Sequence, residues 1–322
     1  MIAVTGAAGF IGSCFITKLN NEGYHDILVI DTLQQDDRWK NLSGKRFRTI
    51  EHPEVFRTKC IQGHYSSKDI TAIIHLGACS ATTERNADYL LDNNYRYSKD
   101  IAEFALHKSI PFMYASSAAT YGAGEKGYSD TSCYGFSPLN MYGYSKQLFD
   151  EWMMNMSYVD NAIGIKFFNV FGPNEYHKLD MASMIFKAYN QIQKTGYIKL
   201  FASNDSSYSN GGQLRDFIYI KDACNVMWKL LSDTSLKGLI NLGTGKARSW
   251  NDLASAVFAA MNLPVNIEYV PMPISLLGQY QNYTQADMTT LLQSDSAYSF
   301  MELEDSISDY ICNYLMPIQQ YY

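Results

Sequence analysis

The chain has 322 residues, of which 47% are hydrophobic and 18% charged, so it can bury a large core and is far from a disordered composition. Its formal net charge of -6, without an arginine-rich block, argues against a nucleic-acid partner. A first strand that begins at residue 2, and the lack of any apolar run of about 18 residues, argue against a leader peptide and a membrane partner, so we expect a cytoplasmic protein.

The first predicted unit is a strand, a glycine-rich turn and a helix. Ile2–Thr5 is a short apolar segment, and apolar residues recur at helical spacing over Phe10–Asn20. Between them, Gly6 and Gly9 allow a tight turn close to a pyrophosphate, and Gly12 lets the helix pack on the strand. This order predicts a dinucleotide site, although glycines also serve turns that are purely conformational.

A second predicted strand, Asp26–Ile30, ends in the acidic residue Asp31. An acid about 20 residues after the glycines is placed to bind a ribose hydroxyl. This context favours a dinucleotide site over a structural turn.

Further apolar runs typical of buried parallel strands alternate with helical patterns. The strands are expected at Ala72–Leu76, Phe112–Ala115 and Ile163–Phe168, and the helices at Asp88–Leu106 and Tyr142–Met156. This alternation predicts the α/β class, with a Rossmann-type doubly wound parallel sheet.

The regular alternation of strand and helix patterns ends after Pro173. An isolated helix, Met181–Gln193, and a short strand, Val265–Val270, indicate a smaller α/β substrate lobe there. One later strand and helix, Asp216–Ile220 and Ala223–Leu231, again have the character of the first domain, so we expect interleaved domains. The expected dinucleotide-binding domain is 1–170 plus about 216–237, and the expected substrate lobe is about 171–215 plus 238–322.

The six cysteines lie far apart, and neither a Cys-x-x-Cys pair nor a His-Glu-x-x-His motif is present. No zinc site or redox dithiol is therefore indicated, and no metal is expected. We expect mostly buried free thiols at Cys14, Cys60, Cys79, Cys133, Cys224 and Cys312.

Three residues suggest chemistry at an alcohol carbon. Removing a hydride from such a carbon requires a base for the hydroxyl proton, and the phenolate of Tyr142 would serve if its pKa fell by ~3 units, or about 4 kcal/mol. Lys146, four residues later on the same helical face, and a positively charged nicotinamide ring would both favour the phenolate. Ser117 follows the strand Phe112–Ala115 and would orient the substrate oxygen. Tyr-x-x-x-Lys also arises by chance among 25 tyrosines, so the pair is informative only together with the glycine turn.

Together these residues resemble the extended short-chain dehydrogenase/reductases and, within them, the ADP-glyceromanno-heptose 6-epimerases. The resemblance runs from Met1 to about Leu315. The segments that carry it are Ile2–Ser13, Leu76–Glu84, Asp92–Tyr95, Tyr114–Gly122, Tyr142–Lys146, Phe168–Pro173 and Tyr283–Asp287. Those typical of the heptose epimerases in particular are Gly77–Glu84, His177-Lys178 with Met181–Ser183, and Gly278–Tyr280 with Thr284–Asp287.

The resemblance implies redox-neutral epimerisation at carbon six of ADP-D-glycero-D-manno-heptose to ADP-L-glycero-D-manno-heptose, through a transient keto intermediate with recycled NAD(P). It makes Tyr142 and Lys178 the acid/base groups, Ser117 the substrate-orienting hydroxyl with Ser116 as its rival, and Lys146 the ribose contact. Without the family, Lys178 is a lysine in a polar loop, and such lysines are mostly solvated. The resemblance also implies lipopolysaccharide core biosynthesis and a homo-oligomer, with a pentamer as the form to test.

The cofactor implied is NADP, with NAD as the alternative. Asp31 would repel a 2′-phosphate, whereas Arg38 occupies the family's basic position, with Lys40 nearby. The implied cofactor contacts are Gly6, Gly9, Phe10, Ile11, Gly12, Asp31, Thr32, Arg38, Leu76, Gly77, Ala78, Cys79, Ser80, Asn93, Lys146 and Val170.

The implied substrate contacts are Ser117, Asn169, Asp180, Lys187, Phe201, Ala202, Ser203, Asn204, Arg215 and Tyr280. Arg215 suits a diphosphate, and its alternative is a surface pair with Asp216. Asp180 and Lys187 replace the small hydroxyl residue and the histidine of other family members, and the loop 205–214 is longer than usual. These departures leave the sugar specificity open.

Two other functions stay open at this point. A UDP-hexose 4-epimerase would share the fold and the Ser117, Tyr142 and Lys146 triad. A nicotinamide-binding regulator without turnover would share the fold alone. A dehydratase is disfavoured because Ser117 is followed by Ala118-Ala119 in place of an acidic pair.

Overall fold

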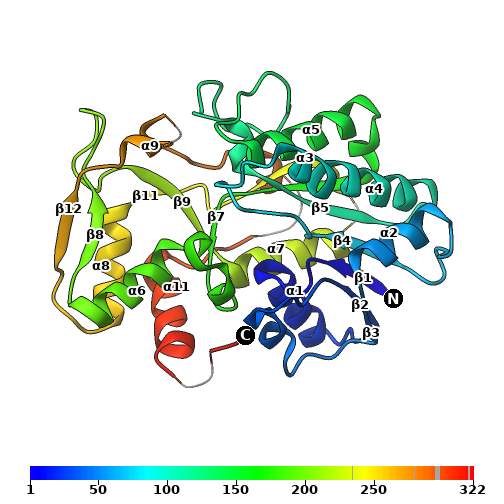
Figure 1. Cartoon of the computed structure of the whole chain (residues 1–322), viewed down its shortest axis with the longest axis horizontal. Coiled ribbons are helices and arrows are strands. Elements are labelled where there is room, and N and C mark those ends of the chain that lie inside the picture. Colours follow the sequence, from blue (N-terminus) through cyan, green and yellow to red (C-terminus); the bar gives the residue numbers. More distant parts are fainter. Residues whose placement is uncertain (234, 279, 294–297, 318–319) are drawn as a thin grey trace.

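The computed structural model describes residues 1–233, 235–278, 280–293, 298–317 and 320–322. Gln279, within the segment Gly278–Tyr280 named above, lies outside them. A large sheet with helices on both faces occupies one end of the molecule, and a smaller lobe occupies the other (Figure 1).

Within the described residues, seven parallel strands form one sheet in the order β10-β6-β5-β4-β1-β2-β3. The strands are β1 (Ile2–Thr5), β2 (Ile27–Ile30), β3 (Thr49–Glu51), β4 (Ala72–His75), β5 (Phe112–Ser117), β6 (Ala162–Phe167) and β10 (Gly238–Leu242). At the centre, Val4 lies between Val29 and Ile74. The central strands β1, β2 and β4 are buried on both faces, as a sheet covered by helices requires, and the predicted doubly wound fold is confirmed.

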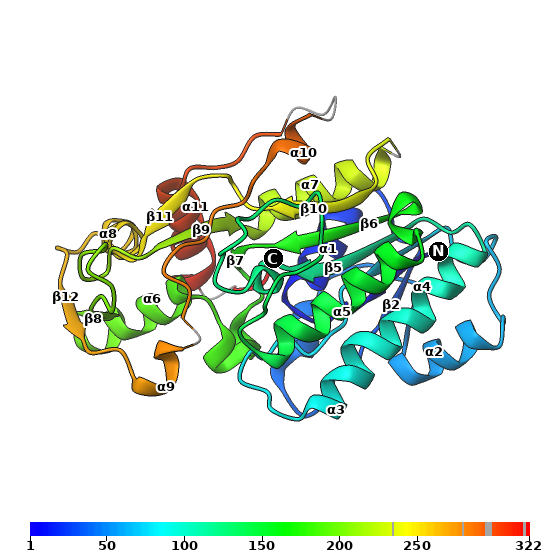
Figure 2. The same ribbon diagram turned by 90° about the horizontal axis from the view of Figure 1, so that it is seen from above.

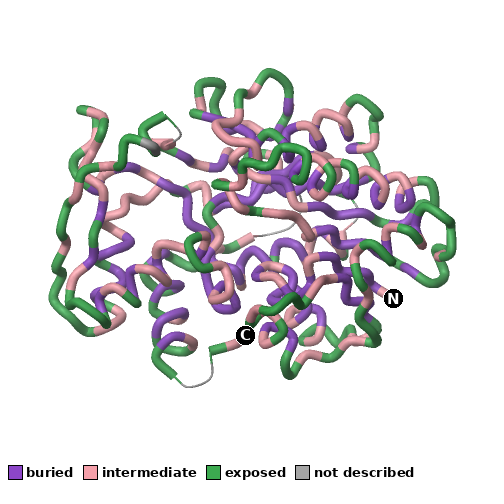
Figure 3. The backbone as a smooth tube through the Cα atoms, viewed as in Figure 1, coloured by how far each residue is buried: buried purple, intermediate pink, exposed green. Residues whose placement is uncertain are grey.

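Helices pack on both faces of this sheet (Figure 2). One face carries α1 (Phe10–Asn21) and α7 (Ile220–Ser232), and the other carries α2 (Pro53–Ile61), α4 (Tyr97–His107) and α5 (Met141–Asn155). Successive residues of a strand point to opposite faces, so Val4 joins the first core and Ala3 the second. The central strands β1, β2 and β4 are consequently buried along their whole length, and the interior of the molecule is purple in Figure 3.

The expected domain boundaries differ from the observed sheet pairing in two places. β9 (Leu214–Tyr219), expected in the large sheet, lies instead between β11 (Ala247–Ser249) and β7 (Asn169–Phe171). β10, expected in the substrate lobe, pairs with β6 at the edge of the large sheet. Helix α7, which follows β9, packs against α1, as expected for a helix of the dinucleotide-binding domain. Both strands are mostly buried, and a buried strand does not by its own sequence specify its pairing partner.

The smaller lobe combines a two-stranded parallel sheet with helices. Its strands are β8 (Ile198–Phe201) and β12 (Ile267–Val270). The helices of the remaining chain are α6 (Met184–Thr195), α8 (Trp250–Ala260), α9 (Ile274–Leu277), α10 (Thr289–Leu292) and α11 (Leu303–Tyr310).

The predicted helix Asp88–Leu106 is divided. α3 (Ala87–Leu90) leads into a π-helical turn, Leu91–Arg96, before α4 begins. The wider turn places Asn94 in the interior, fully buried. Such turns are frequent at functional sites.

Four of the six cysteines are buried, Cys79 is half-buried and Cys312 is exposed, and all six are free. Burial raises the pKa of Cys14 to about 12, so this thiol stays protonated. In the described parts of the chain, no helix has the length and apolar character needed to span a bilayer.

Candidate active site

The glycine turn closes between β1 and α1. Gly6 has a positive φ of 65°, and a Cβ there would lie 2.7 Å from the Gly77 backbone. A Cβ on Gly12 would lie 2.1 Å from the Gly6 carbonyl oxygen, so only glycine lets α1 approach β1. Gly9 precedes α1 without a side-chain cap, leaving the first N–H groups of the helix for an anion. This cradle fits the pyrophosphate of a dinucleotide.

Asp31 stabilises the turn from the end of β2. Its carboxylate accepts hydrogen bonds of 2.7 Å from the N–H groups of Ala8 and Thr32. The Arg38 guanidinium lies 4.0 Å from Asp31 and 2.8 Å from the Asp36 carboxylate. Burial raises the pKa of Asp31, and the hydrogen bonds and Arg38 oppose this. Arg38 is therefore held beside Asp31, close to the end of β2.

The loop after β4, Leu76–Ser80, is fixed by an asparagine that the sequence did not single out. Asn94 Oδ1 accepts from the Cys79 N–H at 2.8 Å, and its Nδ2 donates to the Cys79 carbonyl at 2.9 Å. Nδ2 also donates to Ser145 Oγ at 3.0 Å, which connects the loop to α5. The predicted Asn93 donates to Asn94 at 3.0 Å. The adjacent amides were visible in the sequence, but only the π-helical turn decides which one points inward.

Tyr142 stands in the first turn of α5, which begins at an Asn140 cap that accepts from the Gly143 N–H at 2.8 Å. Burial raises the pKa of Tyr142, whereas its hydrogen bond with the Ser117 side chain lowers it. The chain by itself therefore does not lower the pKa of Tyr142 towards neutrality, which was the condition for a phenolate base, because desolvation of the phenolate outweighs the hydrogen bond. The structure does bring Ser117 and Tyr142 into contact.

Lys146 is buried one turn further along α5. Its ammonium donates to the Ala115 carbonyl at 2.8 Å. Burial lowers the pKa of Lys146 to about 8, while the charge of Asp150 raises it. Lys146 thus presents a tethered cation beside the end of β5.

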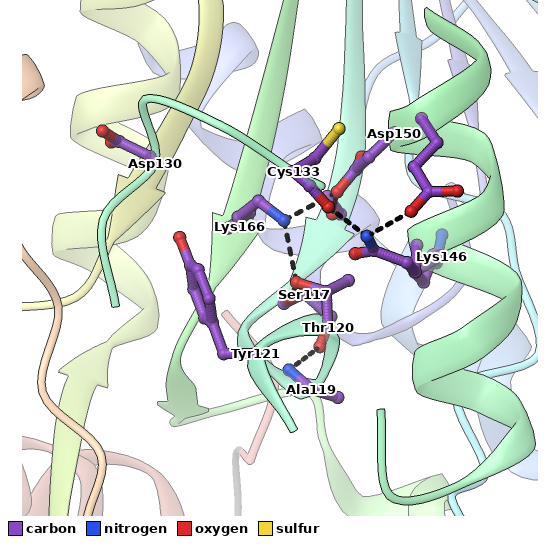
Figure 4. Close-up of polar contacts among 12 residues, drawn as sticks. Ser117, Ala119, Thr120, Tyr121, Asp130, Cys133, Lys146, Asp150 and Lys166 are labelled. Atoms are coloured by element: carbon purple, nitrogen blue, oxygen red, sulfur yellow. Dashed lines mark hydrogen bonds and ion pairs between the residues drawn. The ribbon is translucent and has the colours of Figure 1, made fainter. Parts of the chain in front are cut away.

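Ser116, the rival of Ser117, is buried and belongs to a polar network with Asp150 and Lys166, whose ion pair is shown in Figure 4. Its hydroxyl donates to the Asp150 carboxylate at 2.6 Å. The same carboxylate pairs with Lys166 at 2.8 Å, and both charged side chains are fully buried. Lys166 also donates to Thr120 Oγ1 at 2.7 Å. Because Ser116 is engaged in this network, Ser117 is the hydroxyl that faces Tyr142.

Lys178 lies in the short helix Tyr176–Met181. Its ammonium is 5.5 Å from the centre of the Phe10 ring, at the start of α1. Burial lowers the pKa of Lys178, and the nearby Glu175 raises it. The interpretation of Lys178 as an ordinary solvated lysine is therefore wrong, and this cation lies beside the dinucleotide cradle.

Arg215 lies on β9 and is 6% exposed. Its guanidinium is 5.6 Å from the Trp250 ring centre and 5.0 Å from that of Tyr280. Among the described residues it forms no ion pair. The alternative of a pair with Asp216 is wrong, since that carboxylate accepts from the N–H of Thr244 at 2.7 Å. An unpaired buried cation between aromatic faces is suited to an anionic ligand.

The wall beside Arg215 continues through Tyr280 to Phe201. Trp250 Nε1 donates to the Tyr280 hydroxyl at 2.8 Å, and the rings of Phe201 and Tyr280 are 6.3 Å apart. The Ala202 N–H bonds to β12, and the Ser203 N–H donates to Asn210 at 3.0 Å. Trp250 was missed because it opens α8 after a Ser249 cap, where an aromatic is usually a packing residue.

Asp180 and Lys187, the two residues that differ from those of other family members, lie together. Lys187 Nζ donates to the Asp180 carbonyl at 2.6 Å. The Asp180 side chain is exposed, as is Asn169 on β7, while Val170 is half-buried. Lys187 therefore supports the segment that contains Lys178. The resemblance implied instead that the Lys187 side chain is free to contact the substrate.

No cluster of three or more histidine, cysteine, aspartate or glutamate side chains that would hold a metal occurs among the residues described. The site offers hydroxyl, phenol, ammonium and guanidinium groups. The ammonium and guanidinium groups can bind anions. The hydroxyl, phenol and ammonium groups can exchange a proton with an oxygen on the reacting carbon.

Comparisons with known proteins agree with this chemistry. The model of the NAD dependent epimerase/dehydratase family matches residues 2–243. A relative from Nitratidesulfovibrio vulgaris named ADP-L-glycero-D-manno-heptose-6-epimerase is 49% identical over 317 residues, 98% of each chain. The crystal structure of Helicobacter pylori ADP-L-glycero-D-manno-heptose-6-epimerase has a TM-score of 0.79 at 28% identity, covering 97% of this chain and 95% of that one. A UDP-N-acetylglucosamine 4-epimerase from Methanobrevibacter ruminantium has a TM-score of 0.81 at 20% identity, covering 97% and 96%, a likeness of fold alone.

Proposed function

The chain belongs to the NAD dependent epimerase/dehydratase family, and from this premise we propose that it inverts carbon six of ADP-D-glycero-D-manno-heptose to give ADP-L-glycero-D-manno-heptose. The observation that carries this proposal is the relative of that name at 49% identity over 98% of the chain. The contact between Ser117 and Tyr142 beside a dinucleotide cradle supplies the matching chemistry. The product would serve the assembly of lipopolysaccharide core.

The proposed reaction is redox-neutral. A bound nicotinamide would accept a hydride from carbon six and return it to the opposite face of the resulting carbonyl. Tyr142 and Lys178 exchange the proton of the carbon-six oxygen, one on each side of that carbon, and Ser117 donates a hydrogen bond to the oxygen. The hydroxyl proton and the hydride both return, so substrate and product have the same composition.

The resting protonation states suit these roles. The raised pKa of Tyr142 keeps the phenol protonated in the chain alone, ready to act as an acid. The lowered pKa of Lys178 brings a neutral, basic amine closer to working pH. Lys146, anchored on Ala115, contributes positive charge on the Tyr142 side.

For the cofactor we propose NADP, with Arg38 binding the 2′-phosphate. Both oxygens of Asp31 accept backbone hydrogen bonds, and Arg38 shields this carboxylate. We expect Arg38→Gln to weaken NADPH binding about tenfold relative to NADH, because a charged hydrogen bond contributes about 1.5–3 kcal/mol. Titration of cofactor-stripped protein with each reduced nucleotide measures this ratio.

Arg48→Gln is the matched control, because Arg48 pairs with Asp26 at 2.8 Å on an exposed surface. A parent protein that prefers NADH, or an unchanged ratio in Arg38→Gln, would show that the site selects NAD.

For the substrate we propose that Arg215 binds the diphosphate and that Tyr280 and Phe201 form the adjoining wall. Arg215→Lys should raise the KM for ADP-heptose about tenfold, because lysine lacks the planar fork that binds two phosphate oxygens. Steady-state kinetics of Arg248→Lys give the control, since Arg248 lies directly opposite Arg215 on β11 but pairs with Glu304. Equal KM values for the two variants would show that Arg215 does not bind the substrate.

A panel of sugar nucleotides tests the substrate assignment. We expect turnover of ADP-D-glycero-D-manno-heptose and none of UDP-glucose, because the relative that is 49% identical to this chain is named as a heptose epimerase. Turnover of UDP-glucose alone would identify a UDP-hexose 4-epimerase. The homo-oligomer, including the pentamer, and the cytoplasmic location remain predictions for light scattering and fractionation.

A further inference from the structure

Asn174 and Tyr322 are 148 residues apart and form a reciprocal pair of hydrogen bonds. The Tyr322 N–H donates to Asn174 Oδ1 at 2.8 Å, and Asn174 Nδ2 donates to the Tyr322 carbonyl at 3.0 Å. Asn174 is fully buried. Its side chain thus satisfies a backbone donor and acceptor in the way that a β-ladder does, and it fixes this part of the chain four residues before Lys178.

The same two residues connect to the helix of the dinucleotide cradle. The Tyr322 carbonyl also accepts from Thr17 Oγ1 on α1 at 3.1 Å and from the Lys45 ammonium. Asn174 Nδ2 also donates to Ser13 Oγ on α1 at 3.0 Å. The segment Gln320–Tyr322 therefore lies between α1 and the loop that contains Lys178.

A second set of contacts lies closer to Lys178. The Tyr176 hydroxyl donates to the Gln320 carbonyl, and the rings of Tyr176 and Tyr321 meet edge to face with centres 5.4 Å apart. The Tyr322 ring lies against Lys221, whose ammonium is 5.3 Å from the ring centre. The segment is thus held by side chains from both directions.

The backbone around Lys178 needs such support. Asn174 has a φ of 75° and Leu179 a φ of 48° with ψ of -119°, conformations that cost on the order of 1–3 kcal/mol each in non-glycine residues. The short helix Tyr176–Met181 contains no fully buried residue of its own. Strained backbone persists only where the surroundings hold it. Gln320–Tyr322 holds the Asn174 and Tyr176 side of this loop, and the bond from Lys187 to the Asp180 carbonyl holds the side next to Leu179.

We propose that Asn174, Tyr176 and the segment Gln320–Tyr322 form a clamp that positions Lys178 over Phe10 for proton transfer. This inference rests on the acid/base role proposed for Lys178. The clamp residues act through Lys178 and are positioning residues. Releasing the clamp lets the Lys178 ammonium move away from its place beside the cradle, and a displacement of about 1 Å costs on the order of 100-fold in rate.

The test is a double-mutant cycle between the clamp and Lys178. Asn174→Gly removes the side-chain bonds while glycine tolerates the positive φ. We expect kcat to fall on the order of 100-fold, with the KM for ADP-heptose within about twofold of the parent. In a Lys178→Met background the same substitution should leave kcat unchanged, because the residue that the clamp positions is gone.

Two controls separate positioning from general stability. Asn262→Gly replaces another asparagine of positive φ, exposed and after α8, and should leave kcat unchanged. Tyr176→Phe keeps the ring but removes the bond to Gln320, and we expect kcat to fall about two- to tenfold. Tyr134→Phe, which removes an exposed hydroxyl bonded to Asn155, is its control.

The outcomes distinguish this inference from the proposed function. An unchanged kcat in both Asn174→Gly and Tyr176→Phe, or the same fall in the Lys178→Met background, would overturn the clamp while leaving the epimerase assignment intact. A Lys178→Met protein with the parental kcat would instead overturn the role of Lys178 itself.

Discussion

Tyr142→Phe is expected to lower the kcat of heptose epimerisation by about 10²- to 10⁴-fold, the usual contribution of one general acid/base group. The substitution removes the phenol oxygen but keeps the ring on α5 and the nearby cation of Lys146. Cofactor content and thermal stability should therefore stay near parental values. The measurement is kcat by NMR or anion-exchange separation of the carbon-six epimers.

Tyr144→Phe is the matched control for this prediction. Tyr144 lies on the same helix, two residues later, with 45% of its surface exposed. It should retain the parental rate. If the Tyr142 variant also inverted the substrate at the parental rate, the phenol would have no part in proton transfer.

The second large effect is on stability, and it concerns the buried pair beneath the site. Lys166→Met should lower the free energy of unfolding by about 3–5 kcal/mol, because it leaves the Asp150 carboxylate buried without its counter-ion. Thr120 loses a hydrogen bond in the same variant. Urea unfolding followed by circular dichroism measures the change.

Two further variants test the reason for this loss. Lys199→Met breaks an exposed contact with Glu268 at 3.8 Å and should change stability by less than about 0.5 kcal/mol. Lys166→Met with Asp150→Asn should recover part of the loss, since no charge is then left unpaired. If the double variant were no more stable than Lys166→Met, an uncompensated charge would not explain the effect.

The central strands of the fold were predictable because burial on both faces leaves a continuous apolar run. β1, β2 and β4 were all found at the expected positions. The partner of a strand is not encoded in its own residues, and this is why β9 lies outside the large sheet while β10, within the range expected for the substrate lobe, lies at the edge of that sheet. Pairing depends on contacts far apart in sequence, which periodicity does not report.

The site was predictable where a motif fixes local geometry. It was not predictable where tertiary packing decides the direction and burial of a side chain. The four-residue spacing of Tyr142 and Lys146 places both on one helical face. By contrast, the register at the end of β5 decides that Ser116 turns to Asp150 and Ser117 to Tyr142. The raised pKa of Tyr142 likewise follows from burial, which the residue spacing could not reveal.

One incubation tests the central claim most directly. Purified protein is mixed with ADP-D-glycero-D-manno-heptose without added cofactor, and the carbon-six epimers are followed by NMR. The account predicts conversion to an equilibrium mixture of the D and L epimers, with no net oxidation, because a retained cofactor is recycled in each turnover. Unchanged substrate, even after addition of both NAD and NADP, would contradict the account.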